Sequence, residues 1–333
     1  MAEAFRIVSP TARADTIRNA SEVAEVGEVG LIGRVKRRIG RSPSVVVGIG
    51  DDAAVLRLPR PGAAAHRRGG PGGSLLLFAS DMLVEGVHFT RRSVPARWIG
   101  WKSLACNVSD IAAMGGTPHW AVVSLGVPPA TPVRFVDQLS AGLQACAGAF
   151  DMAIVGGDTV RAPQVVVDVA IVGSVLRAHL TLRSGARIGD MLFVTGRLGG
   201  SLASGRHARF TPRLREAQAL VRRMKVRAMM DLSDGLASDL WQMSRASGVT
   251  LRVEASHIPV ARAAGSLSHA LMDGEDFELL FAVSPRDAAR VPRRIGTTPV
   301  TRIGRVVRRG MGVELEDVRG RVRPLVPRGF HHF

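Results

Sequence analysis

The chain has 333 residues, of which 46% are hydrophobic and 22% are charged, a composition typical of a globular protein rather than a disordered one. No apolar run approaches the roughly 20 residues of a membrane span, and the first 25 residues contain no apolar secretory segment. The two cysteines, Cys106 and Cys146, argue against a disulfide framework or a zinc cluster. We therefore expect a cytoplasmic protein that does not bind a membrane.

The formal net charge of +17 raises the question of nucleic-acid binding. The arginines are scattered in short runs, only 5% of residues are aromatic, and there is no tyrosine to stack on bases. Lysine occurs only at Lys36, Lys102 and Lys225, so the excess of arginine resembles a bias of the whole chain more than a binding face. We expect no dedicated nucleic-acid site, and a general attraction for polyphosphates stays open.

Hydrophobic periodicity predicts strands alternating with helices from residue 27 onward, after a flexible N-terminal arm over residues 1–26. Strands are expected at 44–50, 74–81, 119–127, 152–158, 164–173, 190–196, 228–232, 249–253 and 277–283. Helices are expected at 96–114, 131–150, 213–228 and 233–248, with Thr131 and Ser233 as N-caps. The Pro/Gly/Arg-rich stretch 59–73 is expected to be an exposed loop.

The pattern restarts near Gly173, which divides the chain into two α+β halves. We predict an N-terminal domain over residues 27–174 and a C-terminal α/β domain over residues 175–333.

Aspartates recur in one format: an apolar strand or helix leads to an Asp, with glycine nearby. The stretches are "GIGDDAAVL" (48–56), "FASDMLVEGVHF" (78–89), "NVSDIAAMGG" (107–116), "IVGGDTVRAP" (154–163) and "MDLSDGLASDL" (230–240). Any one of them alone is ordinary turn or cap chemistry, and we expect Asp239 to be solvated or capping. Their recurrence predicts a shared pocket. Carboxylates that converge repel each other unless a cation lies among them, and oxygen ligands without His or Cys favour Mg²⁺.

Two common phosphate-binding signatures are missing: the chain has no G-x-x-x-x-G-K-[ST] loop and no protein-kinase motif set. The "GGD" of residues 156–158 is expected to form a turn that offers backbone N–H groups and a metal ligand. The helix start at Ser233 would supply further N–H donors for phosphate. These features favour a metal-rich phosphoryl-transfer site with few protein cations.

Seven stretches in order resemble the thiamine-monophosphate kinase family, which shares its superfamily with aminoimidazole-ribonucleotide synthetase and selenophosphate synthetase. They are "GIGDDAAVL", "SDMLVEGVHF", "KSLACNVSDIAAMGGTP", "GGDTVR", "LTLRSGARIGD", "DLSDGLASDL" and "GEDFELLF", followed by a terminal "GFHHF". The resemblance covers nearly the whole chain from about residue 27, and seven motifs in the right order make it specific.

The resemblance implies ATP- and Mg²⁺-dependent phosphorylation of thiamine monophosphate to thiamine diphosphate, without a protein nucleophile. It implies a two-domain, aminoimidazole-ribonucleotide-synthetase-like fold, in which the N-terminal domain (27–174) binds ATP and Mg²⁺. It also implies a homodimer that pairs its N-terminal sheets. The residues implied to surround magnesium are Asp52, Ala79, Ser80, Asp81, Asp110, Asp158, Asp231 and Asp234. Those implied for ATP are Gly157, Asp158, Arg183 and Ser233, and those for thiamine monophosphate are His88, Glu275 and Phe330.

Three residues depart from the family pattern. Ala79 replaces a hydroxyl residue, so any ligand there would be its backbone carbonyl; Asp273 replaces a glycine; and Pro327 stands near the position of an aromatic residue that Phe330 would replace. Local sequence alone also allows His88 to be a packed histidine beside Phe89. Two other functions stay open: another ATP-dependent enzyme of this superfamily, or a basic protein that binds polyphosphate or RNA.

Overall fold

The computed structural model describes residues 23–38, 42–57 and 73–326, so the expected arm at 1–26 and the loop at 59–73 lie largely outside the described residues. The chain forms two compact units, one of residues 1–42 with 330–333 and one of residues 43–329. The first contains helix α2 (Val23–Arg38), which is kinked at Gly27. All features below belong to the second unit.

A six-stranded sheet is built from the N-terminal half in the order β1-β2-β3-β6-β4-β5. Its strands are β1 (Val45–Val47), β2 (Ala54–Leu56), β3 (Ser74–Val84), β4 (Thr117–Val127), β5 (Ala153–Arg161) and β6 (Val166–Leu176). Neighbouring strands are antiparallel except β4 and β5, which run parallel. Residues of β3 and β6 alternate between buried and more exposed positions, as expected for a sheet with one covered face.

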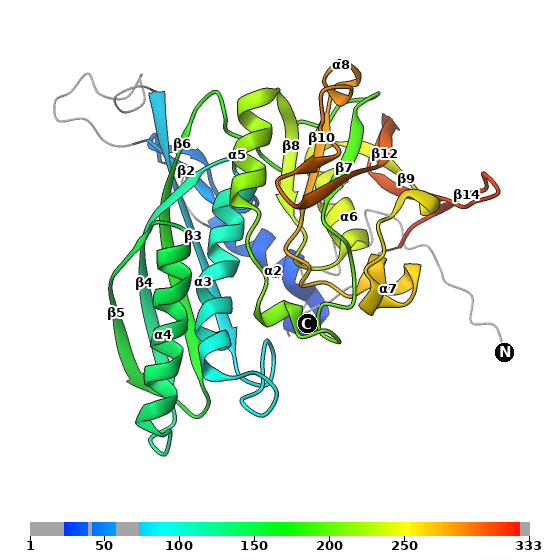
Figure 1. The fold of residues 1–333 in the computed structure, drawn as a ribbon. Helices are drawn as coiled ribbons and strands as arrows, with labels where there is room; N and C mark the ends of the chain where they lie inside the picture. The colour runs from blue at the N-terminus through cyan, green and yellow to red at the C-terminus, as the bar shows by residue number, and fades with distance from the viewer. Residues whose placement is uncertain (1–22, 39–41, 58–72, 327–333) are drawn as a thin grey trace. The chain divides into compact units, whose positions relative to one another are not determined.

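Helices α3 (Ala96–Ala113) and α4 (Val133–Ala149) cover one face of this sheet (Figure 1). Helix α4 is amphipathic and buries only one stripe, including Leu139, Leu143 and Cys146. Helix α3 is buried on almost every side because it also contacts α5 and β8 of the C-terminal half. The polar residues Lys102, Ser103, Asn107 and Ser109 of α3 are therefore buried.

The C-terminal half forms an eight-stranded sheet in the order β14-β13-β9-β12-β7-β10-β8, with β11 paired to β12. Its strands are β7 (Met191–Thr195), β8 (Val226–Asp231), β9 (Val249–Glu254), β10 (Leu279–Val283), β11 (Arg294–Ile295), β12 (Thr298–Arg309), β13 (Gly312–Glu316) and β14 (Val322–Pro324). Its longer helices are α5 (Leu214–Arg223) and α6 (Leu236–Ser247), accompanied by the short α7 (Leu267–Met272) and α8 (Pro285–Ala288).

Both faces of this second sheet are covered. All five residues of β10 are buried, with Phe281 in one hydrophobic cluster and Leu280 in another. The first cluster joins this sheet to α3, α4 and α5, and the second contains Leu236, Leu240 and Met243 of α6. The predicted strands and helices are present in the expected order, whereas β2, the short helices α7 and α8, and all four strands that the structure describes after residue 283 were not predicted.

Several local predictions are wrong. Thr131 does not cap α4, because Pro132 is the N-cap residue and Thr131 Oγ1 is buried without a hydrogen-bond partner in the described structure. Ser233 does not cap α6, which begins after Gly235. The helix expected over 213–228 ends at Arg223, because β8 starts at Val226.

A search of the described residues finds no helix with the length and apolar character that crossing a bilayer requires.

Candidate active site

Three carboxylates from separate parts of the chain meet in the interior. Asp52 precedes β2, Asp110 lies near the end of α3, and Asp231 ends β8. One ligand oxygen of each lies within 4.8 Å of the others. The strands and helix that carry them are fixed by buried apolar residues, so this proximity is built into the fold.

Two further predicted acids lie around these three. Asp81, on β3, is among the charges that raise the pKa of both Asp110 and Asp231. Asp234 raises the pKa of Asp52 and accepts hydrogen bonds from Ser233 Oγ at 3.1 Å and from Gln242 Nε2 at 2.9 Å. The predicted acids of β2, β3, α3 and β8 therefore do share one electrostatic site.

The pKa values of four of these carboxyl groups are raised: Asp52, Asp81, Asp110 and Asp231. Burial is the main cause in each case, followed by neighbouring charge: the pKa of Asp81 rises to about 6, with Asp168 and Asp52 contributing. The pKa of Asp231 rises to about 8, although Ser109 Oγ donates to its Oδ2 at 2.6 Å and opposes the rise. Burial and Asp81 likewise raise the pKa of Asp110 well above its usual value. The site is thus short of positive charge.

Arg183, a predicted ATP-binding residue, contacts Asp52 directly. Its Nε and Nη2 donate to Asp52 Oδ1 at 3.0 and 2.6 Å, and its backbone N–H donates to Asp51 Oδ1 at 3.1 Å. Its Nη1 donates to Gln242, which in turn holds Asp234. Even with this guanidinium beside it, the pKa of Asp52 is raised, because burial outweighs the attraction.

These residues fit a hard divalent cation. Asp52 Oδ2 is buried and has no hydrogen-bond partner among the described residues, which is costly for a carboxylate unless a further cation lies nearby. The donors are all carboxylate oxygens, and they come together without His or Cys. Mg²⁺ prefers such a set and retains waters and phosphate oxygens in its remaining positions.

Other predicted ligands lie on the opposite face of the six-stranded sheet. Ser80 is exposed, points away from the side of β3 that carries Asp81, and donates to Asp168 Oδ1 at 3.0 Å. Asp158 is also exposed and accepts the backbone N–H of Thr159 at 2.8 Å. Asp168 was not predicted from the sequence, yet it links this face to Asp81 by its effect on the pKa there.

The "GGD" of residues 156–158 lies inside β5 and forms no turn, contrary to the sequence prediction. Gly157 pairs with Val123 of β4, and a Cβ there would lie 1.8 Å from the Val123 carbonyl oxygen. Close strand packing therefore requires this glycine whether or not a nucleotide approaches it. Ala79 is 8% exposed, and its side chain supplies no ligand atom.

The predicted acceptor-binding residues His88 and Glu275 are joined by a buried lysine. His88 lies in the turn after β3, where its Nδ1 accepts the backbone N–H of Val84 at 3.0 Å. Lys102 Nζ, from α3, donates to the His88 carbonyl oxygen at 2.9 Å and to Glu275 Oε1 at 2.5 Å. This geometry is compatible with the prediction that His88 and Glu275 contact the same substrate. Lys102 was not predicted as a site residue from the sequence.

Glu275 has an unusual backbone, with φ of 51° in the left-handed region. Such a conformation costs a non-glycine residue roughly 1–3 kcal/mol, and it persists only where the surroundings fix it. Here the Glu275 N–H donates to the Ser233 carbonyl oxygen at 2.6 Å, and Ser201 Oγ donates to the Glu275 carbonyl oxygen at 2.7 Å. Gly274 allows the approach, since a Cβ there would lie 2.9 Å from Ser233 O.

The departures from the family pattern are partly explained. Asp273 Oδ2 accepts the Gly200 N–H at 2.8 Å, and Oδ1 lies 2.7 Å from His269 Nδ1, so this carboxylate anchors the loop next to Glu275. Phe330 and Pro327 lie outside the described residues.

The prediction that Asp239 is solvated or caps a helix is wrong. It is 0% exposed rather than solvated, and neither carboxylate oxygen has a hydrogen-bond partner within 3.5 Å in the described structure. Its pKa is raised well above the usual value by burial and then by Asp234 and Asp231, while the backbone N–H of Asp234 favours its charged form. Helical periodicity could have found it, because Asp239 lies three residues after Leu236 and four before Met243, which are both buried on this helix.

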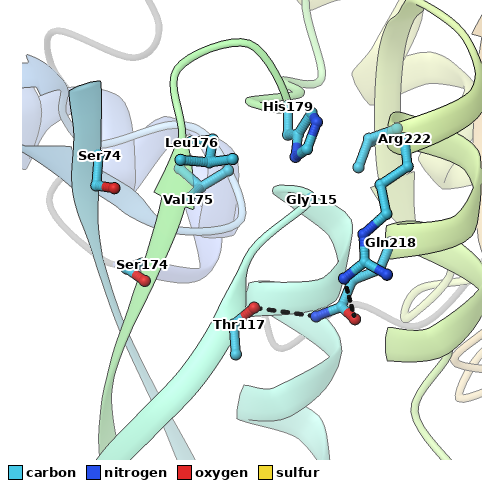
Figure 2. A pocket seen from close by; sticks show the side chains of 10 residues that line it. Ser74, Gly115, Thr117, Ser174, Val175, Leu176, His179, Gln218 and Arg222 are labelled. Atoms are coloured by element: carbon cyan, nitrogen blue, oxygen red, sulfur yellow. Dashed lines mark hydrogen bonds between the residues drawn. The ribbon is translucent and has the colours of Figure 1, made fainter. Parts of the chain in front are cut away.

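A separate open pocket of about 180 Å³ lies at the start of β4 and the end of β6 (Figure 2). It is lined by polar groups such as Gln218, which donates to Thr117 Oγ1 at 3.0 Å, together with His179 and Arg222. It contains none of the predicted site residues and is smaller than the roughly 300 Å³ of a typical small-molecule pocket.

Comparisons with known proteins agree with this geometry. Residues 50–175 match the family "AIR synthase related protein, N-terminal domain", and residues 187–316 match the corresponding C-terminal domain family. Thiamine-monophosphate kinase of Rhodopirellula baltica is 37% identical over 309 residues, covering 90% of this chain and 95% of the relative. That of Bacillus subtilis is 33% identical, covering 87% and 94%.

A solved structure of AaThiL complexed with AMPPCP and TMP has a TM-score of 0.79 and 30% sequence identity, and the match covers 95% of this chain and 100% of that one. One family therefore accounts for the two domain matches, for the order of the motifs and for the relatives matched over most of their length. The chain belongs to the thiamine-monophosphate kinase family.

Proposed function

We propose that this chain transfers the γ-phosphoryl group of ATP directly to the phosphate of thiamine monophosphate, giving thiamine diphosphate and ADP. The observation that carries this proposal is the meeting of Asp52, Asp110 and Asp231 within 4.8 Å in a buried site. Membership of the family supports the reaction, and AaThiL has been solved with AMPPCP and TMP.

The cation site is proposed to consist of Asp52, Asp110 and Asp231, with Asp81 and Asp234 next to it. Bound Mg²⁺ would supply charge neutralisation, so that two mutually repelling phosphates can approach. The protein itself fixes these acids just before β2, within α3 and at the end of β8, elements whose positions are set by core packing. Asp158, Ser80 and the Ala79 carbonyl remain proposed ligands without a contact to the other acids.

ATP is proposed to lie near Arg183, Ser233 and Gly157 with Asp158. Arg183 can serve an anion because its guanidinium has five donors, and its side chain is 23% exposed. Thiamine monophosphate is proposed to contact His88 and Glu275, with Phe330 nearby. The N–H of Glu275 bonded to Ser233 O connects the two proposed subsites.

No general base is needed in this reaction. The attacking group is a phosphate oxygen of the acceptor, and the second pKa of a phosphate monoester is about 6, so the oxygen is largely ionised at neutral pH. The work left to the protein is alignment and electrostatic stabilisation. We therefore propose in-line transfer without a phosphorylated enzyme intermediate.

A homodimer is proposed from the uncovered face of the six-stranded sheet. That face presents large apolar side chains: Phe78 (45% exposed), Met82 (56%), Trp120 (51%) and Val122 (41%). Strand register places them together, since Phe78 and Trp120 both pair with Val172 of β6. A patch of this kind marks an interaction surface, and a second copy would cover it sheet to sheet.

We also propose that the protein functions in the reducing cytoplasm, because Cys106 and Cys146 are free thiols.

The decisive experiment incubates the protein with ATP, Mg²⁺ and thiamine monophosphate and measures thiamine diphosphate. Turnover of a different phosphorylated acceptor, with none of thiamine monophosphate, would retain phosphoryl transfer and overturn the substrate. With ATP chiral at the γ-phosphorus, inversion supports direct transfer, and retention would contradict it.

A further inference from the structure

A buried lysine connects the two segments that the proposed function assigns to the acceptor. The side chain of Lys102 is 1% exposed, and its ammonium group donates to His88 O at 2.9 Å and to Glu275 Oε1 at 2.5 Å. Lysine is almost never fully buried unless it is paired, since an unpaired ammonium loses its hydration without compensation. These two acceptors are therefore what makes burial of this charge tolerable.

The two segments belong to different halves of the protein. His88 follows β3 of the six-stranded sheet, whereas Glu275 precedes β10 of the eight-stranded sheet. Helix α3, which carries Lys102, contacts both β3 and β8. Lys102 thus projects from the element shared by both halves and fixes the position of one segment relative to the other.

The side chain of Glu275 is oriented by Lys102 alone among the described residues. Its backbone is already held by Ser233 and Ser201, but neither of them contacts the carboxylate. Oε1 accepts from Lys102, Oε2 has no hydrogen bond in the described part of the chain, and the side chain is 23% exposed. The lysine therefore presents this carboxylate with one oxygen available to a ligand.

We propose that Lys102 is a positioning residue for the acceptor substrate: it holds His88 and Glu275 in the arrangement that binds thiamine monophosphate and has no part in binding ATP. The inference rests on the proposed function. Neither contact of Lys102 is a predicted metal or ATP ligand, so its removal affects one substrate selectively.

The test compares Lys102→Met with the matched control Lys225→Met, which changes an exposed lysine just before β8, at the opposite end of that strand from Asp231. For each variant, kcat and both KM values are measured, together with equilibrium binding of AMPPCP in Mg²⁺. Lys102→Met is expected to raise KM for thiamine monophosphate at least tenfold, with KM for ATP and AMPPCP binding within twofold of wild type. Lys225→Met should match wild type.

A double-mutant cycle with Glu275→Gln distinguishes loss of positioning by Lys102 from general destabilisation of the protein. If the lysine acts through Glu275, the double variant Lys102→Met/Glu275→Gln raises this KM no more than the larger single change does. Lys102→Gln, whose amide still donates one hydrogen bond, gives an intermediate KM and supplies the comparison should Lys102→Met not fold.

The outcomes are distinct. An active wild-type protein whose lysine variants keep the normal KM for thiamine monophosphate, or raise both KM values equally, overturns the role of Lys102 alone. A wild-type protein that forms no thiamine diphosphate overturns the proposed function and this inference with it.

Discussion

Arg183 holds Asp52 through two hydrogen bonds to the same oxygen, Oδ1, so that Asp52 Oδ2 stays buried without a partner among the described residues. The guanidinium neutralises one side of a carboxylate whose other side faces the acids Asp110 and Asp231. In the absence of metal, Arg183 is thus a major source of positive charge for this cluster.

Replacing Arg183 with Met should therefore destabilise the metal-free protein, because it leaves the Asp52 charge buried and unpaired. Loss of one partner from a buried pair costs about 3–5 kcal/mol, and the partial exposure of Arg183 reduces this to about 2–3 kcal/mol. Thermal and denaturant unfolding with and without Mg²⁺ measures the effect. Mg²⁺ should recover part of the loss; equal loss in both conditions would show that the cation does not bind beside Asp52.

Replacing Asp231 or Asp81 with Asn should lower kcat at least about 100-fold, since each change removes a charge that the cation site requires. Asp317→Asn, in an exposed turn of the eight-stranded sheet, is the control and should be fully active. Calorimetric titration with Mg²⁺ and ATP provides the binding measurement. A basic protein that merely binds polyphosphate or RNA would retain salt-sensitive binding in all three variants, and kinase activity surviving in Asp231→Asn would exclude the proposed site.

Magnesium affinity should rise between pH 5.5 and pH 8.5. The pKa of Asp81 is about 6 and that of Asp231 about 8, and both groups must lose their protons before they can bind the cation. Titrations in buffers of different ionisation enthalpy would report the protons released on binding. Constant affinity and no proton release over this range would contradict the assignment of these acids.

The same shifts set the pH dependence of stability. Because the folded-state pKa values of Asp81 and Asp231 lie above their unfolded values, their contribution is fully present below about pH 4 and is lost as the pH rises through about 6 to 8. The metal-free protein should consequently unfold at lower temperature at pH 8.5 than at pH 5.5. Stabilisation by Mg²⁺ should grow over the same interval, and differential scanning calorimetry measures both trends.

Replacing Met82 or Val122 with Asp should convert the proposed dimer to a monomer, because the charge would be buried in an apolar contact between two sheets. Val318→Asp is the control, as Val318 is 80% exposed on the eight-stranded sheet. Sedimentation equilibrium gives the mass directly. A monomeric wild-type protein, or variants that remain dimeric, would rule out this face.

The order of elements and the convergence of acids could be predicted, because both follow from short-range patterns. Alternation along β6 and helical spacing along α6 are visible in the sequence, and so is the recurrence of aspartates beside apolar segments and glycines. Turns were less predictable: "GGD" has the composition of a turn, but the pairing of Gly157 with Val123 keeps it within β5. Tertiary pairing here overrides the local preference.

Buried polar residues were also difficult to predict from the sequence. Asp239 and Lys102 lie in helical patterns where a charge ordinarily indicates a solvated face, and only the packing of the second sheet against α3 and α6 makes them interior. For Lys102 the signal available was composition, because it is one of only three lysines in a chain of 45 Lys+Arg. Its partners, His88 and Glu275, are 187 residues apart by number (275 minus 88), a separation that no local pattern spans.

The peptide hydrogen bond from Glu275 to Ser233 has a consequence for the order in which substrates add. It joins a segment proposed to contact one substrate to a segment proposed to contact the other, so a ligand that moves the backbone of either segment acts on both. Thermodynamic reciprocity then requires that, if one substrate changes the affinity for the other by some factor, the second substrate changes the affinity for the first by the same factor. An ordered or synergistic kinetic scheme is the natural outcome of a joint this short.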